Sequence, residues 1–190
     1  MKKKFMIPKG NFGYMQNRRL LTVLYTILLF GISITLYFAG IKSTGSNKNL
    51  LTIVAILGCL PASKSAVNMI MFSRYKGCSA SIKEQLNRNY SNLHTLYDMV
   101  FTSYEKNYEI HHMCMNNKVL CAYTSNEKCD AAACEKHLEN MLTQNGHQNI
   151  TVKVFKDFAK YKNRLEQLDS LAELGRTADE IRQLLLEISL

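Results

Sequence analysis

The stretch Leu20–Ile41, LLTVLYTILLFGISITLYFAGI, runs for 22 residues without a charge. As a helix it would be about 33 Å long, which matches a hydrocarbon core about 30 Å thick. It is longer than the apolar part of a secretory signal, about 7–15 residues, and no convincing small-x-small cleavage pattern follows it. The stretch therefore predicts an uncleaved transmembrane helix.

A second apolar run, Leu50–Phe72, is of similar length but less uniform, because Pro61 lies in its middle. Proline is tolerated in membrane helices, where neighbouring groups satisfy the freed carbonyl. Only Lys42–Asn49, a short polar turn, separates the two runs. Residues 20–72 are thus expected to form a transmembrane helical hairpin with spans at about 20–41 and 50–72.

Charge is divided sharply along the chain. Residues 1–79 hold 11 of the 24 Lys and Arg and no acid, whereas the remainder holds 13 basic and 15 acidic residues, a net charge of −2. The basic residues flank the spans instead of clustering on a folded surface, which argues against nucleic acid as a partner. They also concentrate before the first span, in a basic segment at 1–19, and after the second.

This asymmetry predicts a multi-pass protein of the cell membrane with both termini in the cytoplasm, since Lys and Arg are enriched in cytoplasmic flanks. Residues 79–190 would then form a cytosolic domain close to the bilayer. The six cysteines would stay reduced in that compartment, so no disulfide is expected.

The pattern after residue 79 predicts an α+β domain in the order α-β-β-β-α-β-α-α, with a small, mainly antiparallel sheet. A capping box at Ser81–Glu84 begins a helix at about 82–95. Strands are expected at 97–104, 108–115, 118–124 and 149–155, and helices at 131–145, at 158–172 and from a capping box at 177–180.

A cysteine and histidine cluster in the expected hairpin is the main candidate site. A turn at Asn116–Asn117 would pair residue 114 with 119 and 112 with 121. Strand alternation would then place His112, Cys114 and Cys121 on one face together with Ile110, Val119 and Tyr123. Cys134 and His137 on the next helix could complete a zinc site.

The same residues have a plain structural interpretation. The C-x2-C and H-x3-H spacings of strong zinc patterns are missing, and buried cysteine often packs as a small hydrophobe. Cys129 and Cys134 also flank Asp130 as a hydrophobic-staple pair. Core packing is therefore preferred over zinc binding or thiol sensing, and zinc is the one cofactor left open.

The order of elements resembles the core of the restriction-endonuclease-like superfamily, which implies Mg²⁺-dependent cleavage by an acid on one strand and an acid-x-Lys on the next. The corresponding strand here, KVLCAYT, contains no acid, and Glu109 has no evident partner carboxylate. No phosphate loop or hydrolase motif is present either, so no catalytic residue is predicted.

Lys64 is the one charge within a span, and an ionisable residue at that depth is a functional candidate. Neither span offers an acid to pair with it. Snorkelling to the interface, or contact with an anionic lipid head group, is preferred over transport. Several small residues along both spans would also permit close helix contacts in a homo-oligomer or with another membrane protein.

Two stretches, LTIVAILGCLPASKSAVNMIMF in the second span and ITVKVFKDFAKYKNRL in the domain, resemble a family of uncharacterised small two-span membrane proteins from anaerobic Gram-positive bacteria. The resemblance implies the layout and no activity. Together these observations predict a membrane protein that presents its domain for binding or scaffolding at the inner membrane face. A membrane-tethered hydrolase or nuclease and a cytosolic thiol or zinc sensor are the alternatives.

Overall fold

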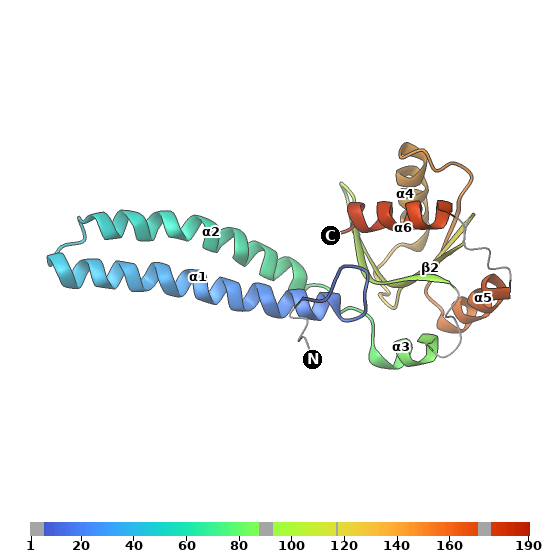
Figure 1. Ribbon diagram of the computed structural model, residues 1–190, viewed down its shortest axis with the longest axis horizontal. Helices are drawn as coiled ribbons and strands as arrows, with labels where there is room; N and C mark the ends of the chain where they lie inside the picture. The colour runs from blue at the N-terminus through green and yellow to red at the C-terminus, as the bar shows by residue number, and fades with distance from the viewer. Residues whose placement is uncertain (1–5, 88–92, 117, 171–175) are drawn as a thin grey trace. The chain divides into compact units, whose positions relative to one another are not determined.

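The computed structural model describes residues 6–87, 93–116, 118–170 and 176–190. The chain forms two compact units, residues 15–76 on one hand and residues 1–14 with 77–190 on the other. The first is a pair of long helices and the second is an α+β domain (Figure 1). This is the fold class that the sequence predicts.

The two long helices are α1, Tyr14–Thr44, and α2, Leu50–Ser73. Both are long and apolar enough to cross a membrane, and only 11% and 17% of their most apolar stretches are buried. Small and hydroxyl residues line the contact between them: Thr26 and Ser65 share a hydrogen bond of 2.7 Å. Asn49 caps α2 by accepting a hydrogen bond from the Thr52 amide at 2.8 Å.

The domain is built on a four-stranded sheet in the order β1-β2-β3-β4. The strands are β1 (His94–Thr102), β2 (Asn107–Asn116), β3 (Val119–Tyr123) and β4 (Thr151–Phe155). The first three are antiparallel, and β4 is parallel to β3 because α4, Ala131–Gln144, crosses over between them. The predicted sheet is thus confirmed as small and mainly antiparallel, with one parallel pair.

Helices cover both faces of this sheet (Figure 1). One face packs against α4 and α6, Arg176–Ile188, and we call it the α4/α6 face; its core includes Met113, Leu138 and Ile181. The other face packs against α5, Phe158–Ser170, and α3, Ala80–Asn87, and we call it the α5 face. The apolar stripes of the last two helices are thus used within the domain's own core.

Both edges of the sheet are covered. At β1, the Tyr97 amide donates to the Gly10 carbonyl and the Leu190 amide to the Val100 carbonyl, each at 2.8 Å. At β4, the Val154 amide donates to Glu135 of α4 at 2.9 Å. These contacts occupy edge groups that would otherwise be open to another strand.

Element boundaries differ most from the predictions at two helices and at the first strand, which spans His94–Thr102 instead of 97–104. The helix expected at 82–95 is wrong beyond α3: residues 88–92 lie outside the described residues, and His94 and Thr95 pair with β2 as part of β1. Its cap is Ser79, which accepts from the Ile82 amide at 3.3 Å, instead of Ser81. The helix α6 begins at Arg176, before the expected cap at Thr177.

Candidate functional site

Cys114 and Cys121 lie directly opposite each other on β2 and β3. The predicted register, which paired residue 114 with 119, is wrong by two residues, because β2 extends to Asn116 before the turn; Asn117 lies outside the described residues. Both thiols are fully buried on the α5 face. Burial, and then the hydrogen bond with Cys121, hold the pKa of Cys114 well above its ordinary value.

His112 lies beside these thiols and contacts α5. Its Nδ1 is 2.6 Å from the Tyr161 hydroxyl, and its ring is 4.6 Å from that of Tyr97. Burial lowers the pKa of His112 to about 3, so the imidazole is neutral at neutral pH. Its Nε2 is buried and has no hydrogen-bond partner among the described residues.

The predicted face is only partly confirmed. His112, Cys114 and Cys121 do meet on the α5 face, whereas Ile110 packs on the α4/α6 face. The neighbouring strand shows the same break: Tyr97 packs on the α5 face and Met99 on the α4/α6 face, with Asp98 between them at a left-handed φ of 54°.

Cys134 and His137 lie on the other side of the sheet. Cys134 is fully buried in the core of the α4/α6 face, and His137 lies against the Tyr108 ring, 5.5 Å between centroids. The structure therefore does not bring these two together with His112, Cys114 and Cys121, since the sheet lies between them. Among the described residues, no three His, Cys, Asp or Glu side chains are grouped to hold one metal ion.

The expected staple around the start of α4 is confirmed. Asp130 accepts a hydrogen bond from the Ala133 amide at 3.1 Å, and Cys129 and Cys134 are both buried in the same core cluster. A hydrogen bond from Cys134, and more weakly the charge of Lys156, lower the pKa of Cys129 to about 7. Both cysteines thus serve the helix start.

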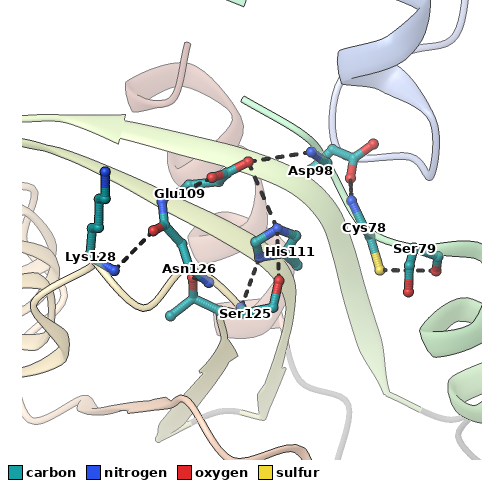
Figure 2. Close-up of polar contacts among 10 residues, drawn as sticks. Cys78, Ser79, Asp98, Glu109, His111, Ser125, Asn126 and Lys128 are labelled. Atoms are coloured by element: carbon teal, nitrogen blue, oxygen red, sulfur yellow. Dashed lines mark hydrogen bonds and ion pairs between the residues drawn. The ribbon is translucent and has the colours of Figure 1, made fainter. Parts of the chain in front are cut away.

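A second polar cluster, centred on Asp98, was not predicted (Figure 2). Asp98 lies in the middle of β1 and is only 3% exposed. Its Oδ2 accepts from the Gly13 amide at 2.8 Å, and its Oδ1 accepts from the Cys78 amide at 2.6 Å. Gly13 directly precedes α1, and Cys78 follows α2, so one carboxylate binds both segments that lead into the helical pair.

Glycine is needed at both of these segments. Gly13 has a φ of 81° and Gly77 a φ of 73°, which other residues rarely adopt. A Cβ at Gly77 would also lie 3.1 Å from Asp98 Oδ1. The backbone therefore comes close enough for its amides to reach the carboxylate. We call Gly13, Gly77, Cys78 and Asp98 the Asp98 junction.

Glu109 on β2 extends the cluster from the junction to the loop after β3. Its Oε1 accepts from the Gly77 amide at 3.3 Å, and its Oε2 accepts from the Asn126 side-chain amide at 3.1 Å. Glu109 thus does lie on the strand next to another buried carboxylate, that of Asp98. Both carboxylates accept hydrogen bonds from the protein, which is a structural use.

His111, Glu109 and Ser125 contain the residue types of a hydrolytic triad, but their geometry does not match one. His111 Nδ1 accepts from the Ser125 backbone amide at 3.2 Å, so the proton is on Nε2. That same Nε2 lies 3.3 Å from Ser125 Oγ and 3.8 Å from Glu109 Oε1. A triad uses one nitrogen for the acid and the other for the nucleophile, so the arrangement of these three residues differs from that of a triad.

Burial of His111 lowers its pKa, opposed by the charges of Glu109 and Asp98. The one sequence signal for this cluster was Asp98 itself, a charged residue between Tyr97 and Met99 in an apolar strand. Its partners could not be predicted, because they come from segments 85 and 20 residues away.

Lys64 lies on α2 with its side chain exposed, next to the buried Ser65. It is two residues, or about 200° around the helix, from the buried Ala62, so it faces away from the contact with α1. The structure thus places the one charge of the two apolar runs on the outer surface of the helical pair.

No family model, curated protein or solved structure is significantly similar to this chain. The resemblance to small two-span membrane proteins stays a prediction.

Proposed function

We propose that this chain is an integral membrane protein whose α1 and α2 cross the bilayer as a hairpin, with both termini in the cytoplasm. The α+β domain is presented at the inner membrane face, where it binds or organises a partner and carries out no catalysis. The partner is a second copy of the chain or another membrane protein.

One observation carries the proposal: the segment before α1 and the domain after α2 form one compact unit. The Asp98 junction and the Tyr97–Gly10 hydrogen bond hold that segment within the domain. Two parts of one folded unit must lie on the same side of a membrane. This supports an even number of spans between them, which α1 and α2 supply.

Three further features support the cytoplasmic side and a binding role. Basic residues are concentrated beside the domain ends of the two helices. All six cysteines are free, as expected in a reducing compartment. The buried carboxylates and His111 are engaged in structural hydrogen bonds, which gives the hydrolase or nuclease alternative no support among the described residues.

The exposed apolar surface supports insertion of α1 and α2 into the membrane. Of the large hydrophobic side chains that are exposed in the described residues, all but Met6 and Tyr104 belong to α1 and α2. Exposed apolar surface on this scale needs lipid or another apolar surface to cover it.

Extraction of membranes from cells that express the full chain tests the proposal. We expect the chain to stay in the membrane pellet through washes with high salt and then with alkaline carbonate, which release proteins held by charge. Solubilisation should require detergent. Release into the carbonate supernatant would contradict membrane insertion, and a free domain fragment generated by proteolysis is recognised by its size.

A further inference from the structure

Lys64 has no charge partner within the helical pair. The chain contains no acid before Glu84, so no carboxylate is available in α1, in α2 or in the turn between them. Its neighbours at the helix contact are uncharged, since Thr26 and Ser65 bond to each other. The negative charge that balances Lys64 must come from outside this unit.

The hydrogen bond between Thr26 and Ser65 gives the depth of Lys64. It sets Lys64 near the level of Thr26, six residues into the apolar run that begins at Leu20. Six residues correspond to about 9 Å, and the long stem of lysine lets its ammonium group rise toward the interface from there. The ammonium group can therefore reach the level of the lipid phosphate groups from within the apolar part of the bilayer.

Asn68 is a second polar residue on this side of α2. It lies one turn after Lys64 on the same side of α2 and is half-buried. Arg74, which is exposed, follows at the end of the helix. Lys64 and Asn68 thus place an ammonium group and a side-chain amide on one side of α2, and both can donate hydrogen bonds to a phosphate.

We propose that the outer surface of α2 at Lys64 and Asn68 binds the head group of an anionic phospholipid of the cytoplasmic leaflet. The inference rests on the proposed membrane insertion. It goes further by naming the ligand, its charge and the residues that select it. Complementary charge is the basis of selection, because a zwitterionic head group offers its own cation and balances Lys64 less well.

Native mass spectrometry of the full chain in mild detergent tests the site. The protein is titrated with phosphatidylglycerol and with phosphatidylcholine of the same acyl chains. We expect wild type to retain more phosphatidylglycerol, and Lys64→Met to reduce the ratio of the two bound lipids about five-fold, the usual value of one lysine near an anionic surface. Lys64→Arg, which keeps the charge, should keep the ratio.

Lys48→Met is the matched control, since it removes the same charge from the exposed turn at the other end of the helical pair. The ratio of bound phosphatidylglycerol to bound phosphatidylcholine should stay within two-fold of wild type in Lys48→Met. An unchanged ratio in Lys64→Met, or an equal fall in Lys48→Met, would overturn the site. Carbonate extraction does not depend on the head group, so failure of the lipid site and failure of membrane insertion are told apart.

Discussion

Asp98 joins β1 to two segments of the domain that are distant from it in sequence. Its carboxylate accepts from the Gly13 amide, which precedes α1 in the chain, and from the Cys78 amide, which follows α2, and its backbone has a left-handed φ. Asparagine and aspartate tolerate this conformation better than other residues with a side chain. The residue therefore combines a backbone role and a charge role, and one substitution can separate them.

Asp98→Asn keeps the shape and the tolerance for positive φ but loses the charge. Both oxygens of Asp98 accept from backbone amides, and Asn has only one side-chain oxygen. The hydrogen bond to one amide is therefore lost, because the NH₂ group faces it, and the hydrogen bond to the other amide is weaker without the charge. We expect the free energy of unfolding of the domain to fall by roughly 2–3 kcal/mol. Urea unfolding of the full chain in detergent micelles measures this.

Glu105→Gln is the control for Asp98→Asn, because it removes a carboxylate from an exposed position in the β1–β2 turn. It should change the free energy of unfolding by less than about 0.5 kcal/mol. Equal stabilities of Asp98→Asn and wild type would show that the Asp98 junction contributes little to the fold.

The pKa of His112 predicts a pH dependence of stability. In the folded protein it is about 3, and in the unfolded chain it is near the ordinary value of 6.5. Between these values the unfolded chain binds a proton that the folded protein excludes, so stability falls as pH decreases from about 6.5. From pH 7 to pH 5 we expect His112 to contribute a loss of roughly 2 kcal/mol.

The comparison of wild type with His112→Gln isolates this contribution, since all other groups titrate in both. Urea midpoints at pH 7 and pH 5 give the two losses. The loss of unfolding free energy between pH 7 and pH 5 should be smaller for His112→Gln than for wild type by roughly 2 kcal/mol. Identical pH dependence in the two proteins would mean that folding does not lower the pKa of His112.

At the scale of elements, the outer edge of β4 is closed by side chains of α4. Glu135 and Glu139 are one turn apart and accept from the amides of Val154 at 2.9 Å and Val152 at 3.5 Å. Glu135 also forms an ion pair with Lys153 at 3.3 Å. Thus α4, which connects β3 to the parallel strand β4, also covers the outer edge of β4.

Glu135→Ala should open this edge. With its acceptor removed, the Val154 amide is expected to exchange with deuterium about five-fold faster, since a single hydrogen bond contributes on the order of 1 kcal/mol. Glu127→Ala, at an exposed position, should leave the exchange rate unchanged. Hydrogen exchange read by mass spectrometry of the β4 peptide measures both, and equal rates would contradict the edge contact.

The contact between α1 and α2 makes a matched prediction for two glycines. A Cβ at Gly58 would lie 2.7 Å from the Ser33 hydroxyl, whereas a Cβ at Gly31 would meet nothing within 4 Å. Gly58→Val should therefore force the helices apart, and Gly31→Val should not.

Cysteines introduced at Thr26 and Ser65, whose oxygens are 2.7 Å apart, report the helix contact. Oxidation in membranes should cross-link this pair rapidly, and Gly58→Val should slow the reaction several-fold relative to Gly31→Val. Equal rates in the two valine variants would mean that the helices do not pack along this seam.

Most elements could be predicted, because they depend on local patterns. The two apolar runs, the cap at Asp130 and the end of α4 at Asn145–Gly146 are each specified by a few adjacent residues. The start of β1 was missed, since His94 and Thr95 become a strand only through pairing with β2. The candidate zinc ligands are separated for a related reason: Cys134 and Cys114 are close in sequence, but the sheet lies between them.

At the scale of the whole chain, the layout follows from where the first residues are found. The apolar runs alone predict two spans but do not say whether the segment before them belongs with the domain. The contacts of Gly10 and Gly13 show that it does. No sequence pattern predicts these contacts, because they depend on two glycine conformations and a carboxylate in a distant strand.

The central claim, that the first residues and the domain share one side of the membrane and the 45–49 turn lies on the other, is tested most directly by cysteine labelling. Single cysteines replace Met6, Tyr104 and Ser46, which are all exposed, and wild type reports the background from the native thiols. Intact cells are treated with a membrane-impermeant maleimide before and after permeabilisation. The account predicts that Ser46→Cys reacts in intact cells, and that Met6→Cys and Tyr104→Cys react only after permeabilisation. Labelling of Met6→Cys and Tyr104→Cys on opposite sides would contradict it.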